Sequence, residues 1–220
     1  AQGEILVPFA IESSLSGVGK RVSKGEALWY EREFTVPKQW KGKNVLLHFG
    51  AVDWHAEVFV NDVFLGEHKG GYDPFSFDVT PALKKSGKQV IRVKVQDATD
   101  NSFQPRGKQC IINTGIWYTP VTGIWQTVWM EAVDKAGLER VQVFTDIDNS
   151  QLVVTPTFYT TPSGNRFAIT VKDGDKVVAK KDFVASQGLP VVVPIKKAKL
   201  WTPETPFLYD VVYEVLNAED

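Results

Sequence analysis

An irregular stretch from Asp97 to Thr122 carries the residue types best suited to bind a polyhydroxylated ligand. Trp117 and Tyr118 are adjacent in this stretch, and their flat rings can pack against the C–H face of a sugar. The stretch lacks the regular alternation seen elsewhere, and a long irregular segment in a compact domain is usually functional or mobile. Side chains that can bind hydroxyl or acidic groups accompany the two aromatic residues, namely Asp97, Arg106, Lys108 and Gln109.

These residue types divide into three roles. We predict that Asp97 and Gln109 bind sugar hydroxyls, that Arg106 and Lys108 bind an acidic or polar group, and that Trp117 covers a ring face. Two alternatives stay open at this stage. Trp117 could instead close one end of the core, because tryptophan is highly buried on average, and the two cations could be solvated loop charges.

The sequence shows no clear motif for nucleophilic catalysis or phosphate binding. The sequence contains no Gly-x-Ser-x-Gly elbow, and Gly17–Lys20 lacks the full spacing of a phosphate-binding loop. Asp97 and Asp100 form a local acidic pair, but a glycosidase pair must face across a cleft at ~5–9.5 Å, and turn formation explains these two better. Carboxylates are numerous in this chain, so counting them does not exclude such a pair elsewhere.

The composition narrows the ligand classes. Lys plus Arg number 25 and Asp plus Glu number 26, so there is no basic excess to attract nucleic acid. The longest apolar runs, such as Pro190–Ile195, are far shorter than the ~20 residues of a membrane span. One cysteine and three separated histidines predict neither a disulfide framework nor a metal site. We expect no cofactor, no nucleic-acid partner and no membrane partner.

The elements that must position the aromatic stretch are strands. Apolar and polar residues alternate over 45–49, 56–60, 91–95 and 124–130, which is the period of half-buried strands. Asn61 and Asp62 separate two short strands and tolerate the positive φ of a tight hairpin turn. Thr80 is predicted to cap one helical turn. Trp125 and Trp129 are expected to share a core-facing strand face.

A second group of short strands follows. They are predicted at 138–146, 151–159, 166–172, 176–184, 189–196 and 207–216, separated by turn residues. This spacing favours an immunoglobulin-like sandwich. The sequence thus predicts an all-β protein with two domains, residues 1–135 and 136–220.

An ordered series of motifs along nearly the whole chain resembles glycoside hydrolase family 2, which includes β-galactosidases, β-glucuronidases and β-mannosidases. Each motif is short, and the order carries the resemblance. The motifs are Val7–Ser13, Trp29–Tyr30, Phe34–Pro37, Val45–Asp53, Val58–Asp62, Gly66–Tyr72, Phe75–Thr80, Thr122–Trp129 and Leu200–Tyr209.

The resemblance implies a galactose-binding-like jelly roll, which is the family's sugar-binding domain, followed by the immunoglobulin-like domain. In the family a (β/α)8 barrel with two catalytic glutamates follows. The barrel is missing here, so the resemblance implies a non-catalytic N-terminal region that supports the barrel, lines the sugar cleft and is inactive alone. Several members place an acid shortly before the Gly-Ile pair, whereas Trp117 or a near neighbour stands there in this sequence.

Two other functions remain open: a free-standing carbohydrate-binding module, and purely structural domains that brace a partner. Fold resemblance cannot choose among them, because function lives in sites placed on folds. The family resemblance implies a bacterial periplasmic or extracellular enzyme, with the cytoplasm still open. The sugar and its linkage are not readable from these residues.

Overall fold

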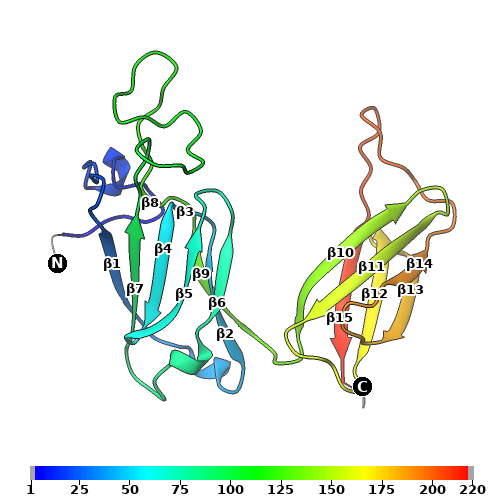
Figure 1. The fold of residues 1–220 in the computed structure, drawn as a ribbon. Coiled ribbons are helices and arrows are strands. Elements are labelled where there is room, and N and C mark those ends of the chain that lie inside the picture. The colour runs from blue at the N-terminus through cyan, green and yellow to red at the C-terminus, as the bar shows by residue number, and fades with distance from the viewer. Residues whose placement is uncertain (1–2, 218–220) are drawn as a thin grey trace. The chain divides into compact units, whose positions relative to one another are not determined.

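The computed structural model describes residues 3–217, and strands joined by turns dominate it (Figure 1). The only helical elements among these residues are the short 3-10 turns η1 (Ser14–Ser16), η2 (Lys38–Trp40) and η3 (Thr80–Ala82). The all-β prediction is confirmed. The chain forms two compact units that meet in sequence between Val133 and Asp134, two residues before the predicted boundary.

The first unit contains a four-stranded antiparallel sheet in the order β1-β7-β4-β5. Its strands are β1 (Leu28–Phe34), β7 (Gln89–Gln96), β4 (His55–Val60) and β5 (Val63–Lys69). Strand β4 shows why this sequence forms a sheet, since every second residue of it is buried. The predicted hairpin is confirmed, because Asn61 and Asp62 have φ values of 50° and 67°.

A second sheet in the order β6-β2-β9 contributes the other side of the core. Its strands are β6 (Phe75–Asp78), β2 (Asn44–Phe49) and β9 (Val128–Val133), and β3 (Val52–Asp53) pairs separately with β8 (Gly123–Ile124). The helical turn near Thr80 is present, but its N-cap is Val79. The Thr80 hydroxyl instead accepts a hydrogen bond from the Val45 N–H at 2.7 Å.

The strand predicted over 124–130 is interrupted. Strand β8 ends at Ile124 and β9 begins at Val128, so Trp125 and Trp129 do not share one strand face. Trp129 is 47% exposed and stacks on His48, with ring centroids 4.0 Å apart. Its assignment to the core was wrong, because alternation separates the two faces of a strand without showing which one is covered.

The aromatic stretch emerges where β7 ends and returns where β8 begins (Figure 1). Figure 1 shows it in green as looped chain beyond the ends of these strands. One isolated bridge, between Gln109 and Tyr118, is the regular pairing within it. We call residues 97–122 the long segment.

The second unit contains two three-stranded sheets in the orders β10-β11-β14 and β13-β12-β15. The predicted strand ranges agree with the observed ones within a few residues. Buried Val154, Phe158, Phe167 and Ile169 lie in its core. The strands are β10 (Leu138–Asp146), β11 (Gln151–Phe158), β12 (Arg166–Asp173), β13 (Lys176–Val184), β14 (Val191–Pro194) and β15 (Asp210–Leu216).

Gly123 tests how tightly the end of the long segment is joined to the sandwich. Its φ is +90°, and a Cβ there would lie 2.1 Å from the Tyr30 Oη atom. We expect Gly123→Ala to lower the free energy of unfolding by ~2–4 kcal/mol, from backbone strain plus overpacking. Urea denaturation of the chain measures this loss.

Gly87→Ala is the matched control, because Gly87 has φ +84° with nothing within 4 Å of the added Cβ. It should lose only the strain, roughly 1 kcal/mol. Equal losses for the two variants would show that the contact with Tyr30 contributes nothing.

Candidate functional site

A single buried carboxylate joins the two ends of the long segment. Asp97 directly follows β7 and is 5% exposed. Its Oδ1 accepts hydrogen bonds from the Thr99 N–H at 2.7 Å and the Gln104 Nε2 at 2.6 Å. Its Oδ2 accepts from the hydroxyls of Thr122 at 3.0 Å and Thr99 at 3.4 Å. Since Thr122 closes the segment, Asp97 fixes both its beginning and its end.

Gln109 attaches the middle of the segment to the sandwich. It is buried, and its Nε2 donates to the Asp53 Oδ2 at 2.9 Å while its Oε1 accepts from the Val121 N–H at 2.6 Å. Gly71 makes room for Asp53, because a Cβ at that glycine would lie 2.6 Å from the carboxyl carbon. The attachment of Gln109 to Asp53 therefore depends on residues from three distant parts of the sequence.

Three acidic side chains meet at the base of the segment, with no ion pair to any of them among the described residues. Glu12 accepts a hydrogen bond from the Thr122 N–H at 2.9 Å, and burial raises the pKa of its carboxyl. Burial also raises the pKa of Asp53 to about 7, with the nearby Asp97 and Glu12 adding to the rise and the Gln109 hydrogen bond opposing it. Desolvated carboxyl groups of like charge resist ionisation.

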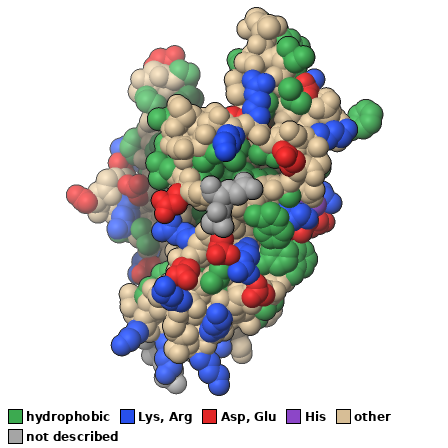
Figure 2. Space-filling view, turned by 90° about the vertical axis from the view of Figure 1, so that its left-hand side faces the viewer, with side chains coloured by type: hydrophobic (Ala, Val, Ile, Leu, Met, Phe, Trp, Pro, Cys, Tyr) green, Lys and Arg blue, Asp and Glu red, His purple; other side chains and the backbone are tan. Residues whose placement is uncertain are grey.

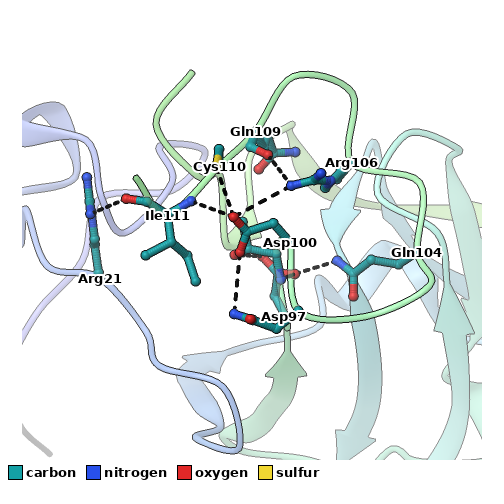
Figure 3. Close-up of polar contacts among 10 residues, drawn as sticks. Arg21, Asp97, Asp100, Gln104, Arg106, Gln109, Cys110 and Ile111 are labelled. Carbon is teal, nitrogen blue, oxygen red and sulfur yellow. Dashed lines mark hydrogen bonds and ion pairs between the residues drawn. The ribbon is translucent and has the colours of Figure 1, made fainter. Parts of the chain in front are cut away.

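Asp100 organises the next part of the segment (Figure 3). Its Oδ2 accepts from the Cys110 thiol at 2.9 Å and the Ile111 N–H at 3.1 Å, and Arg106 Nη1 lies 3.6 Å away. These contacts, the thiol hydrogen bond first among them, lower the pKa of Asp100. Arg106 also donates to the Gln109 carbonyl at 3.0 Å, so the turn between them is held from both sides.

The N-terminal loop braces the outer side of the segment. Arg21 donates to the Ile111 carbonyl at 2.7 Å and to the Asn113 Oδ1 at 3.1 Å, and Figure 3 shows its side chain beside Ile111. Lys24 donates to the Asn101 carbonyl at 3.0 Å. The segment is thus anchored mainly by side chains, which satisfy polar backbone groups that strands would otherwise pair.

The aromatic residues form an exposed edge. Trp117 is 41% and Tyr118 60% exposed, so Trp117 does not close the core. The Arg106 guanidinium lies 5.8 Å from the Trp117 ring centroid, and the Lys108 Nζ lies 5.9 Å from the Tyr118 ring centroid. We call Arg106, Lys108, Trp117 and Tyr118 the aromatic edge.

The backbone holds the aromatic edge together. The Tyr118 N–H donates to the Lys108 carbonyl at 2.8 Å, and the Cys110 N–H donates to the Tyr118 carbonyl at 3.0 Å. Two distant stretches of the segment are therefore fixed side by side. The result is a pair of rings flanked by cations, an arrangement suited to binding and without a catalytic acid–base pair of its own.

The six predicted contact residues separate into two groups. The aromatic edge brings four of them together at the surface. Asp97 and Gln109 are buried with their side-chain atoms bonded inside the protein, so we reassign them from binding hydroxyls to positioning the segment. Sequence reasoning missed Glu12, Asp53 and Arg21, because nothing in their local pattern signals a contact so far along the chain.

No group of His, Cys, Asp and Glu side chains within residues 3–217 is arranged to hold a metal ion. No helix in the described chain is long and apolar enough to cross a membrane.

Family comparisons match both units. Residues 20–131 match the model described as "Glycosyl hydrolases family 2, sugar binding domain", and residues 134–220 match the model described as "Glycosyl hydrolases family 2". A β-galactosidase from Thermoanaerobacter pseudethanolicus is 30% identical over 86% of this chain and 26% of its own length. A β-glucuronidase from Formosa agariphila is 27% identical over 84% of this chain and 21% of its own.

Solved structures show the same fold. A β-glucuronidase from glycoside hydrolase family 2 superposes with a TM-score of 0.73 at 24% identity, covering 97% of this chain and 26% of that protein. A family 2 member from Bacteroides cellulosilyticus gives a TM-score of 0.71 at 19% identity, with 98% and 29% coverage. The chain spans about a quarter of the length of these relatives.

The carboxylate of Asp97 is the contact whose removal should free the segment. Asp97→Ala leaves several donors unpaired inside the protein, so we expect a loss of about 3 kcal/mol in unfolding free energy. Trypsin should then cleave faster after Arg106 and Lys108. Urea denaturation and mass-resolved proteolysis measure the two effects.

Asp175→Ala serves as the control, because Asp175 is an exposed turn residue of the second unit. It should change neither stability nor cleavage in the segment. Wild-type cleavage rates in Asp97→Ala would contradict the anchoring role of Asp97.

Proposed function

We propose that this chain, which belongs to glycosyl hydrolase family 2, is the sugar-binding region of a longer glycosidase and contacts carbohydrate through the aromatic edge. The family match supports the first part, since the sugar-binding domain model covers most of the first unit. The greater length of the relatives supports the claim that this chain is one region of a longer glycosidase. A catalytic domain would lie in the sequence that the relatives have beyond the match.

The exposed ring of Trp117 is the observation that carries the proposal. An exposed tryptophan on an irregular segment would ordinarily move freely, but here the surrounding chain is fixed by Asp97, Gln109 and Asp100. A rigid, exposed ring next to hydrogen-bond donors is a favourable platform for the C–H face of a sugar. Preorganisation lowers the entropy cost of binding.

Lys108 favours an acidic sugar. The ion pairs of the described residues engage Arg106 with Asp100 but leave Lys108 without a carboxylate partner. The relatives include proteins named β-galactosidase and β-glucuronidase, whose names imply a neutral and an acidic sugar respectively. An exposed ammonium beside an aromatic ring suits the carboxylate of a uronic acid.

The long segment also presents apolar side chains that suit a protein surface. Phe103 is 109%, Ile112 78% and Ile116 65% exposed. Exposed apolar side chains gathered in one segment often mark an interaction site. We propose that they pack against the (β/α)8 barrel, so that the aromatic edge lines its sugar cleft.

A periplasmic or extracellular location of the protein stays a prediction.

The distribution of charge fits a sugar-directed surface better than a nucleic-acid one. Figure 2 shows acidic and basic side chains interspersed over the visible face, with hydrophobic side chains gathered in patches between them. A surface that tracks phosphates needs a basic stripe.

Replacing Trp117 tests the proposal directly. We expect Trp117→Ala to weaken binding of glucuronide or galactoside oligosaccharides about tenfold, or ~1.4 kcal/mol, with unchanged thermal stability because the ring is half exposed. Isothermal titration calorimetry measures the affinity, which we expect near ~0.01–1 mM for the wild-type chain.

Trp129→Ala is the matched control, since Trp129 is similarly exposed on β9 and outside the aromatic edge. It should bind as the wild type does. If the wild-type chain bound neither sugar, the purely structural alternative would replace this proposal.

Lys108→Gln tests the preference for an acidic sugar. We expect it to weaken glucuronide binding two- to threefold, about 0.5 kcal/mol, and to leave galactoside binding unchanged. The wild-type preference should also shrink at high salt, because exposed ion pairs are screened. Equal losses for both sugars would assign Lys108 a general contact instead of a charge-specific one.

A further inference from the structure

Asp53 is buried at the base of the long segment without enough partners for a charge. It is 2% exposed, and its Oδ1 is buried with no hydrogen-bond partner in the described structure. Its Oδ2 has one partner, the Gln109 amide at 2.9 Å. A buried carboxylate normally needs a cation or several donors, so this environment suits the neutral acid better than the anion.

The groups around Asp53 do not offset a negative charge. Glu12 approaches from the N-terminal loop and Asp97 from the end of β7, and both are acidic. Tyr30 from β1 lies against Gly123, and its hydroxyl oxygen accepts a hydrogen bond from the Ile124 N–H at 3.2 Å. Burial raises the pKa of Tyr30 to about 12. Gly71, in the loop after β5, packs closely against the Asp53 carboxyl group and brings no charge to it.

Asp97 differs from Asp53 in a way that matters here. Asp97 accepts hydrogen bonds from four donors and so has partners for both oxygens. Glu12 resembles Asp53, because its Oε1 is also buried without a partner. Asp53 and Glu12 are thus the two acids at the base with fewest donors, and Asp53 is the one that holds Gln109.

We propose that Asp53 is a positioning residue that clamps the long segment through Gln109 while it carries a proton, and releases the segment as it ionises. The neutral carboxyl still accepts the Gln109 hydrogen bond. Ionisation adds a charge beside Glu12 and Asp97, which is relieved when the segment lifts and water reaches Asp53. The aromatic edge would thus be ordered in mildly acidic solution and looser in alkaline solution.

The direction follows from proton linkage. The pKa of Asp53 is about 7 when the segment is closed, and an exposed aspartate returns to the ordinary 3.8. Between these values the closed form holds one proton that the open form has lost. The closed form is therefore favoured at low pH, and the opening constant rises up to about tenfold per pH unit until pH 7 and then levels off.

Hydrogen exchange of the 220-residue chain tests the proposal. Protection factors, corrected for the intrinsic exchange rate at each pH, are measured for the amides of Val121 and Tyr118 between pH 5 and pH 8.5. We expect protection to fall by up to about a hundredfold from pH 5 to pH 7 and then to stay constant. Protection of β4 amides reports whether the sandwich remains folded.

Asp53→Asn keeps the shape of the side chain and cannot ionise, so protection of the segment should stay high at every pH. Asp146→Asn, in the second unit, should behave as the wild type does. Flat protection in the wild type, or an unchanged pH slope in Asp53→Asn, would overturn the proposal. If Asp53→Asn fails to fold, Gln109→Leu decides, since it should give low protection at all pH values.

The proposal uses the proposed function only in naming what the segment positions. Glucuronide titrations at pH 5.5 and pH 8 separate the two ideas. If protection depends on pH but the chain binds sugar at neither pH, the role of Asp53 is supported and the sugar contact at the aromatic edge is refuted. If the chain binds sugar but protection does not change with pH, the sugar contact is supported and the role of Asp53 is refuted.

Discussion

The closure of the long segment on the Asp97 carboxylate is the interaction on which the candidate site depends. The segment leaves one strand and returns to another with almost no strand pairing of its own, so its polar backbone groups need other partners. Asp97 joins its two ends, Gln109 ties its middle to β3, and Asp100 shapes the turn near Cys110. Without these contacts the aromatic edge would have no fixed geometry.

Three acidic side chains at the base of the long segment lack a compensating positive charge in the described structure. Glu12, Asp53 and Asp97 lie together with no ion pair to any residue within 3–217, and of the three only Asp97 has donors for both carboxylate oxygens. Buried polar groups that lack partners are costly and are tolerated mainly where function needs them. In this protein the poorly paired acids lie at the base of the long segment, which holds the aromatic edge. Their unfavourable burial is therefore connected with the positioning of a candidate binding surface.

The sequence predicted the parts of the molecule that depend on local patterns. Alternation located the strands, and Asn61-Asp62 located a hairpin, because both signals lie within a few residues. The irregular composition of 97–122 also located the chain that leaves the sheets between β7 and β8. The roles of Asp97 and Gln109 were not predictable in this way, since the partners Gln109–Asp53 and Thr122–Glu12 are 56 and 110 residues apart. Trp129 shows the complementary failure, because alternation alone does not say which sheet face is covered.

Under the proposed function, carbohydrate contacts this region at Trp117. The most direct test is a titration of the 15N-labelled chain with glucuronic acid and galactose, followed through the indole N–H signals of its seven tryptophans. We expect the Trp117 signal to shift in a saturable way while those of Trp29 and Trp129 stay in place. A Trp117 signal that stays unmoved at saturating sugar, or a shift confined to the other tryptophans, would contradict this contact.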